Sequence, residues 1–424
     1  MGRADLTTPR APRPSQGAGH RTSASATGSP CKRSRASATD LSSASSVSGS
    51  SIVSGESGRS RKSQSPQKQA TILNIFSDNP IRHNELHELM ELESLPSDLE
   101  QLLGLLLTVQ EGRSVLSNLD RLELSAKIRG SALSKRWLDD ARHFDDGRPQ
   151  YGPTPPPQQV QKLVGRAGDC WKRNCEEAVW NLEVHQSVLC MALRPDHDTS
   201  RRLTFYASTT APILPDYTDQ DSEVKVNLKV DFCIFVNPTK DTSAPMQPTI
   251  QALQRRLPGA SVNHSSSFSL KGFPLAVCIE TKRSEAGRLS AVNQLGVWQR
   301  SHFAFLRRLR DEARRLATSA GQTLPPRLDA LPRWLPGLVV LGHTWHFVPA
   351  TMDDGPRGVT TWFGTEAFGG TTSVLETYKV VLALQVVRAW VEETFWPWLR
   401  ELMVHIQQLS DKMATSSQSQ GGAG

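Results

Sequence analysis

Large hydrophobic residues are nearly absent from the first 70 residues and become regular after Ile72. Residues 98–109 show apolar positions at helical spacing behind an aspartate that can cap a helix. A shorter helix is expected over 83–95. We therefore predict a helical N-terminal extension over residues 71–146, which a Pro/Gly-rich linker at 147–160 separates from the rest of the chain.

The pattern over residues 161–410 predicts a second, larger domain. Residues 238–271 look like a polar loop, and Pro397 is expected to interrupt the last helix. The resulting order, αβββαβ, predicts a layered α/β core followed by a long C-terminal helix. The expected elements are a helix at 176–193, strands at 202–207, 226–236 and 273–282, a helix at 290–317, a strand or hairpin at 337–348 and a helix at 371–409.

Composition changes this picture at the two ends of the chain. Residues 1–70 are rich in Ser and basic residues and lack the apolar side chains needed to offset chain entropy, so they are predicted to be disordered. The polar residues 411–424 are expected to be disordered as well. The net charge of +7 comes from the N-terminal tail and leaves the remainder nearly neutral, so it does not indicate that the folded part binds nucleic acid.

No secretory signal follows Met1, and no apolar run reaches the roughly 18 residues that span a bilayer. An intracellular protein without membrane contact, nuclear or cytoplasmic, is the simplest interpretation. Basic clusters at 32–35 and 59–62 are either a nuclear import signal or solvated charge. The six cysteines form no C-x-x-C pair, which favours free thiols in a reducing compartment.

Candidate chemistry lies at the end of an apolar strand, in Glu280-Thr281-Lys282. Side chains alternate along a strand, so Glu280 and Lys282 point to the same face. Asp231 interrupts a second apolar strand in the same fashion. If the two strands are neighbours, Asp231 and Glu280 can share one cation, and hard carboxylate ligands suit Mg²⁺ or Mn²⁺. The simpler alternative is a pair of surface carboxylates with Lys282 as a solvated partner.

These residue types suit phosphodiester hydrolysis. Two carboxylates can hold a cation against the scissile phosphate, where it polarises the phosphoryl oxygen and acidifies water. A nearby lysine can orient or deprotonate that water and offset the negative charge that develops in the transition state.

The flanking helices strengthen this interpretation. The helix before the strands contains Glu177-x-x-Trp180-Asn181-x-Glu183-Val184-His185, and the helix after them contains Gln294-Leu295-Gly296-Val297-Trp298. Together with the D…E-x-K pattern, they resemble the PD-(D/E)XK nuclease superfamily. The combined motifs are most similar to a group of fungal nuclease-like proteins. The resemblance covers about residues 165–400 and implies a restriction-endonuclease-like α/β core, in which helices flank a central mixed sheet.

The resemblance also implies roles for individual residues. It makes Asp231 and Glu280 metal ligands and Lys282 the catalytic lysine. Glu183 matches the helix acid that can join the metal ligands, and Gln294 matches the glutamine that positions catalytic groups or DNA. Two departures stand out: Val230 replaces the proline of the motif, and a long spacer separates Asp231 from Glu280.

Two functions from different classes are compatible with these motifs. The leading hypothesis is a Mg²⁺- or Mn²⁺-dependent nuclease acting on nucleic acid, with DNA preferred. The alternative is a nuclease-fold module that binds nucleic acid or protein without cutting, which the nearly neutral folded part favours. Glu177 is expected to be a solvated helix residue, and His185 and His264 are expected to be structural or surface groups and not general bases.

One short stretch suggests a further partner. Residues Gln69 to Phe76 resemble a peptide that docks on sliding clamps, although Ile75 stands where that peptide has an aromatic residue. The favoured alternative is that these are the first apolar residues of the folded unit.

Overall fold

A six-stranded mixed sheet forms the centre of the described fold, with strand order β12-β9-β8-β6-β5-β4. Strand β6 runs parallel to β8 and antiparallel to β5, and seven of its eight residues are buried. An apolar run of this kind is typical of a strand covered on both faces. The strands are β4 (Leu203–Ala207), β5 (Phe232–Val236), β6 (Leu275–Lys282), β8 (Gly337–Leu341), β9 (Thr344–Phe347) and β12 (Gly369–Gly370).

The computed structural model describes residues 64–93, 95–195, 201–218, 229–243, 245–352 and 358–421, the last six without their side chains. Most of the predicted N-terminal tail, the first residues of the strand expected at 226–236, and residues 422–424 lie outside these ranges. The described residues belong to one unit that begins at Lys62. Within them, no helix combines the length and apolar character required to cross a membrane.

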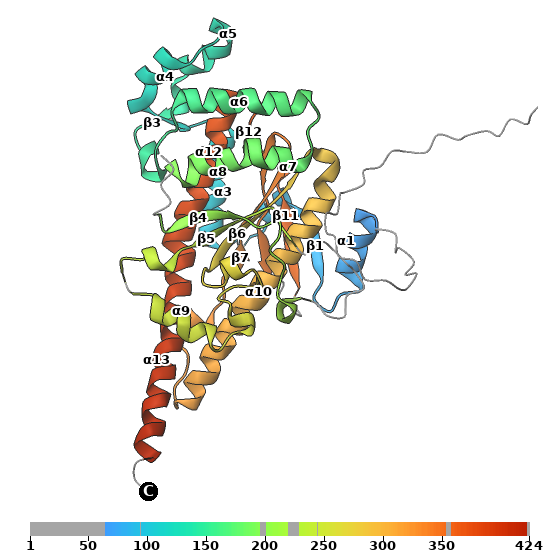
Figure 1. Cartoon of the computed structure of the whole chain (residues 1–424). Coiled ribbons are helices and arrows are strands. Elements are labelled where there is room, and N and C mark those ends of the chain that lie inside the picture. Colours follow the sequence, from blue (N-terminus) through green and yellow to red (C-terminus); the bar gives the residue numbers. More distant parts are fainter. Residues whose placement is uncertain are drawn as a thin grey trace, which may run out of the picture. The chain divides into compact units, whose positions relative to one another are not determined.

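Helices flank the sheet in the order expected for an αβββαβ core (Figure 1). Helix α7 (Glu177–Trp180) continues through a π-helical turn, η5 (Asn181–His185), into α8 (Gln186–Leu193) and precedes β4. Helix α10 (Arg288–Ser319) follows β6 and packs against both β6 and β8. The predicted α/β fold class is therefore confirmed.

The predicted linker at 147–160 is packed into the fold. Residues Arg148–Tyr151 form a short 3₁₀ helix, and Arg148 is buried. Its guanidinium donates hydrogen bonds to Val115 O and Gly152 O, each at 2.8 Å, and to Gln385 Oε1 at 2.7 Å. Pro157 already begins the next helix. The helices before and after this segment are α3 (Ser97–Gln110), α4 (Arg121–Lys127), α5 (Ala132–Lys135) and α6 (Pro157–Lys172).

A second sheet contains a strand where the sequence pattern predicted a helix. The helix expected at 83–95 is instead strand β1 (Ile81–Glu85) followed by the short helix α2 (Leu86–Met90). Strand β1 pairs in parallel with β11 (Val359–Phe363), which lies far away in sequence, and β10 (Ala350–Met352) and β7 (Trp334–Leu335) complete the sheet. Tertiary pairing of this kind overrides local propensity.

Helix α1 (Pro66–Ile75) includes part of the stretch predicted to be disordered. It packs against α10, where Asn293 Nδ2 donates a hydrogen bond of 2.9 Å to Pro66 O. In the candidate clamp-docking stretch Leu73 is buried, whereas Ile75 and Phe76 are 67% and 72% exposed. Docking on a sliding clamp stays a prediction.

Two other segments also differ from expectation. The supposed polar loop at 238–271 contains α9 (Gln247–Gln254), whose Ile250 and Leu253 are buried. The last helix does not end at Pro397: α12 (Val374–Trp390) passes through a π-helical turn, η12 (Val391–Phe395), into α13 (Trp396–Gly421). The wider turn lies directly before the proline, which has no N–H to donate. Helix α13 also covers most of the C-terminal segment expected to be disordered.

Two stacked histidines make stability sensitive to acid. The rings of His264 and His302 lie 5.1 Å apart, and both are buried. Burial lowers the pKa of His302 from 6.5 to about 3, and it also lowers the pKa of His264 well below its ordinary value. Below the unfolded pKa of 6.5 the unfolded chain therefore binds more protons than the folded chain.

We expect the free energy of unfolding to fall as the pH drops from 6.5, by about 2 kcal/mol per buried histidine near pH 5. Glu280 acts in the opposite direction, because burial raises its pKa. The comparison of wild type with His302→Phe in denaturant titrations at several pH values isolates the histidine contribution. The variant should lose less stability on acidification, and an unchanged pH dependence would contradict this prediction.

Candidate active site

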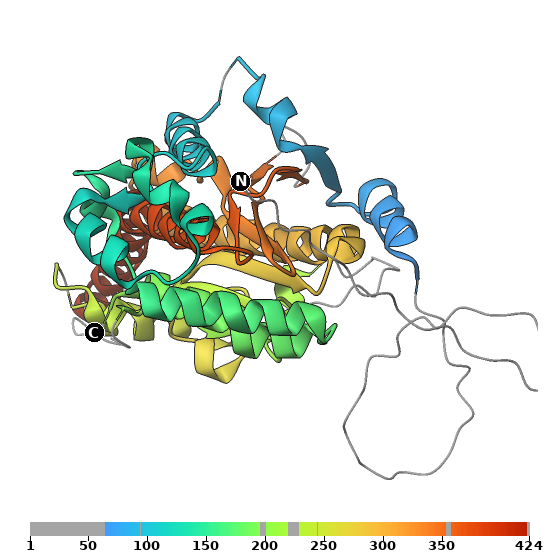
Figure 2. The same cartoon turned by 90° about the horizontal axis from the view of Figure 1, so that it is seen from above.

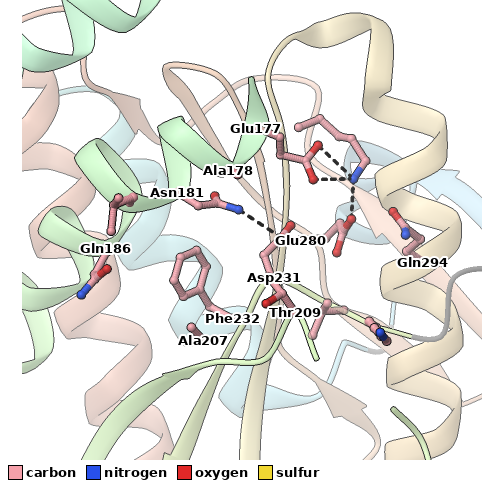
Figure 3. Close-up of a pocket in the computed structure, with 14 residues that line it drawn as sticks. Glu177, Ala178, Asn181, Gln186, Ala207, Thr209, Asp231, Phe232, Glu280 and Gln294 are labelled. Carbon is pink, nitrogen blue, oxygen red and sulfur yellow. Dashed lines mark hydrogen bonds and ion pairs between the residues drawn. The ribbon is translucent and has the colours of Figure 1, made fainter. Parts of the chain in front are cut away.

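Five separate parts of the chain, among them the end of β4, line one pocket of about 460 Å³ (Figure 3). Helix α7 and the π-helical turn after it provide one wall, the residue before β5 and the end of β6 form the base, and α10 closes the side. The polar and charged side chains that could take part in catalysis or ligand binding are Glu177, Asn181, Asp231, Glu280, Lys282 and Gln294.

Glu280 and Lys282 lie on one face of β6, as the strand alternation predicted. Lys282 Nζ lies 2.6 Å from Glu280 Oε1 and 3.3 Å from Glu177 Oε2, and it also donates to Thr281 O at 2.9 Å. Burial opposes the charge on Lys282, but the nearby Glu280 and Glu177 outweigh this effect and raise its pKa. Lys282 is therefore held as an ammonium ion with a fixed direction.

The pKa of Glu280 moves in the direction expected of a buried acid. Its side chain is almost fully buried, and this burial together with the neighbouring Asp231 raises the pKa well above the ordinary value. Burial also raises the pKa of Glu177. A site that places carboxylates together away from water favours either protonation or a bound cation.

Asp231 immediately precedes β5 and is held by the neighbouring strand. Its Oδ2 accepts hydrogen bonds from Thr281 N at 2.9 Å and Thr281 Oγ1 at 2.8 Å, and its Oδ1 accepts one from Asn181 Nδ2 at 3.1 Å. Strands β5 and β6 pair directly, with Phe232 opposite Ile279. The long spacer therefore does not prevent the two acidic residues from meeting.

A buried histidine supports the amide that holds Asp231. His185 Nδ1 lies 2.9 Å from Asn181 Oδ1, and His185 Nε2 lies 2.9 Å from Gly342 O. The two residues are four apart in the π-helical turn, so the ring fixes the direction of Asn181 between the helix and the sheet. His185 thus has a positioning role, and no sequence pattern indicated that Asn181 contacts the site.

Gln294 reaches the pocket from α10. Its side chain is buried, and among the described residues its Oε1 has no hydrogen-bond partner. An unsatisfied buried carbonyl is costly, which makes this amide suited to contact a bound ligand.

The donor set fits a hard divalent cation. Glu177, Asp231 and Glu280 each offer one carboxylate oxygen, and these atoms lie within 4.8 Å of one another. Oxygen ligands of this type are those that Mg²⁺ and Mn²⁺ prefer. A cation there would also relieve the repulsion that raises the pKa of Glu280.

The helix acid differs from the one expected. Glu183 is 44% exposed, and its carboxylate lies 3.9 Å from Arg166 Nη1, outside the pocket lining. Glu177, expected to be solvated, is the helix residue that faces Glu280 and Lys282. Glu177 and Asn181 are four residues apart and share a helix face, but this spacing points to the site only once the contact of Asn181 with Asp231 is known.

A family model for the PD-(D/E)XK nuclease superfamily matches residues 127–396, more than half of the chain. The chain belongs to this nuclease superfamily. A search of curated proteins and a search of solved structures each gave no match. All the pocket residues described above lie within the matched range of this PD-(D/E)XK protein, and membership supports a nuclease-type function that depends on a divalent metal.

The two helix acids can be compared directly in this PD-(D/E)XK protein. We expect Glu177→Gln to lower metal-dependent cleavage about 10- to 100-fold, because it removes a carboxylate that faces both the cation site and Lys282. Glu183→Gln is the matched control and should keep wild-type cleavage. Initial rates over a Mg²⁺ titration measure both, and a larger loss in Glu183→Gln would reinstate Glu183 as the ligand.

Proposed function

We propose that this PD-(D/E)XK protein hydrolyses phosphodiester bonds in nucleic acid, with DNA as the preferred substrate and Mg²⁺ or Mn²⁺ as the cofactor. Asp231, Glu280 and Glu177 would hold the cation. The observation that carries the proposal is the gathering of these carboxylates around one point beside the Lys282 ammonium, in a pocket of a nuclease superfamily member.

Lys282 is assigned to charge stabilisation and to the orientation of water. Glu280 and Glu177 raise its pKa, and a lysine that keeps its proton is a poor general base. Contacts with Glu280 and the carbonyl of Thr281 fix the direction of the ammonium. A positive charge that is positioned in advance can stabilise the negative charge that develops on the phosphate in the transition state.

Gln294 and Asn181 complete the arrangement without carrying charge. The free carbonyl oxygen of Gln294 can accept a hydrogen bond from the attacking water. Asn181 keeps Asp231 in place through its amide nitrogen. When bound, the cation supplies positive charge opposite the phosphate oxygen and makes water more acidic.

The pKa of Glu280 gives this site a pH dependence. Burial and the neighbouring Asp231 raise that pKa, so the Glu280 carboxyl keeps its proton to a higher pH than an exposed glutamate does. A carboxylate must lose its proton to act as a ligand, and cation affinity therefore rises with pH.

Cleavage of labelled single-stranded DNA, duplex DNA and RNA of one sequence, in Mg²⁺, Mn²⁺ or EDTA, tests the proposal. Cleavage in either cation that stops in EDTA supports it, and faster cleavage of DNA than of RNA supports the substrate preference. Binding of the same nucleic acids without cleavage in either cation would contradict the proposal and favour the non-cutting module.

A further inference from the structure

A second pocket adjoins the candidate active site and has the opposite charge. It encloses about 700 Å³ between α6, α8 and the proline-rich residues 153–156. Leu182 and Gln186 line both this pocket and the candidate active site, so the two spaces share a wall. Helix α6 contacts α7 and the π-helical turn η5, which leads into α8. Figure 1 shows α6 along this segment, and Figure 2 shows these green helices from above.

The second pocket contains only basic charges. Lys162, Arg166 and Arg194 line it, and none of the described lining residues is acidic. The candidate active site next to it instead holds three carboxylates. A ligand that spans both pockets should carry negative charge where it meets the basic residues of the second pocket. In the candidate active site, a cation must lie between the same negative charge and the carboxylates. A phosphodiester backbone meets both conditions.

Two of the three basic side chains are available to a ligand. Arg194 is committed to the fold, because its Nε donates to Thr204 Oγ1 at 2.6 Å and its guanidinium lies 4.0 Å from the centre of the Phe205 ring. Lys162 and Arg166 are exposed and lie four residues apart on α6, so they share one face.

The existing contacts of Arg166 are weak enough to be shared with a phosphate. Its Nη2 donates to Ser187 Oγ at 3.1 Å, and its Nη1 lies 3.9 Å from Glu183. Arg166 and Glu183 are both 44% exposed, and an exposed ion pair of this length contributes little free energy. A guanidinium in such a place can still bind a phosphate with two hydrogen bonds.

The shared wall also offers an apolar contact. Leu182 is 66% exposed, and burial of this aliphatic side chain against a ligand would be favourable because it removes apolar surface from water. It lies between the carboxylate cluster and the basic pocket, where the base of a nucleotide would pass.

We propose that the second pocket binds the unpaired nucleotides that flank the scissile phosphate, with Lys162 and Arg166 on backbone phosphates and Leu182 against a base. The inference rests on the proposed nuclease function and adds a substrate class: a strand that is single-stranded on this side of the cut. The pocket has the volume of a small-molecule site. A duplex does not fit into a space of this volume, because a duplex is wider than its major groove, and that groove alone is about 12 Å wide.

The test uses the full chain in EDTA, which separates binding from cleavage. Fluorescence anisotropy gives the affinity for a short labelled oligodeoxynucleotide at several salt concentrations, for wild type and for the double variant Lys162→Gln/Arg166→Gln. The matched control, Lys240→Gln/Arg255→Gln, removes the same charges from exposed positions outside both pockets. Thermal denaturation checks that all three proteins are folded.

Loss of two phosphate contacts should weaken single-strand binding about tenfold at low salt. It should also reduce the slope of log affinity against log salt by about 1.4, since each contact to a single strand contributes about 0.7. The control should match wild type on both measures. A blunt duplex of the same sequence should bind more weakly than the single strand and lose less affinity in the double variant.

Three outcomes would overturn the inference: no single-strand binding by wild type, equal losses in the double variant and the control, or equal losses for duplex and single strand. A separate cleavage assay distinguishes this inference from the proposed function. Wild type that binds with the expected slope but never cuts in Mg²⁺ or Mn²⁺ supports the pocket and contradicts the nuclease. Wild type that cuts while the double variant binds like the control supports the nuclease and overturns the pocket.

Discussion

Replacement of Glu280 by Gln should lower metal-dependent cleavage by about 1000-fold or more, because the proposed cation site loses its most buried carboxylate. Gln has nearly the same size, and Lys282 keeps its contacts with Glu177 and Thr281 O. The variant should therefore stay folded. Single-turnover cleavage measures the loss, and thermal denaturation in a Mn²⁺ titration should show a smaller stabilisation by the cation than in wild type.

A control acid lies five residues further along the chain. The side chain of Glu285 is 61% exposed and pairs with Arg288, so Glu285→Gln removes one carboxylate without reaching the cluster. It should retain wild-type cleavage and wild-type stabilisation by Mn²⁺. Cleavage by Glu280→Gln at the rate of this control would refute the assignment of Glu280 as a ligand.

The second large effect is expected from Lys282→Met, which should reduce the rate of cleavage about 100- to 10,000-fold. Met fills a similar volume but removes the ammonium that faces Glu280 and Glu177. The three carboxylates proposed to hold the cation remain, so the variant should still bind Mn²⁺. A titration with Mn²⁺ measures two quantities. The maximal rate of cleavage should fall, whereas the Mn²⁺ concentration that gives half of the maximal rate should change much less.

Lys240→Met serves as the control for this substitution, because Lys240 is exposed and lies outside the pocket. It should cut at the wild-type rate. If Lys282→Met lost cation binding together with cleavage, the lysine would be maintaining the site and not acting on the phosphate. Activity that persists undiminished in Lys282→Met and in EDTA would indicate a contaminating nuclease.

The site residues that could be predicted from the sequence are those whose placement follows from the regular geometry of a single strand or helix. Strand alternation places Glu280 and Lys282 on one face. Gln294, which the resemblance to the superfamily indicated, lines the same pocket from α10. Asp231 could be paired with Glu280 once the two apolar strands were taken as neighbours, and β5 and β6 do pair. These inferences need only short stretches of chain.

The parts that failed depend on contacts between distant segments. The positions of Glu177 and Glu183 depend on how the helix faces the sheet, and Glu183 lies within the π-helical turn, which changes the regular spacing. Strand β1 exists because β11 pairs with it, and nothing near Ile81 in sequence indicates that partner. Helix α9 was hidden in a polar segment because only a few of its residues are buried.

The pairing of β1 with β11 and the packing of α1 on α10 determine where the protein can be cut for expression. A fragment limited to the family-matched residues 127–396 would lack both segments and most of α13. The edge of β11 would lose its hydrogen-bonding neighbour, and an open strand edge promotes aggregation. Asn293, next to Gln294, would lose its partner Pro66 O. A recombinant protein should therefore include the chain from α1 to α13, beyond the boundaries of the family match.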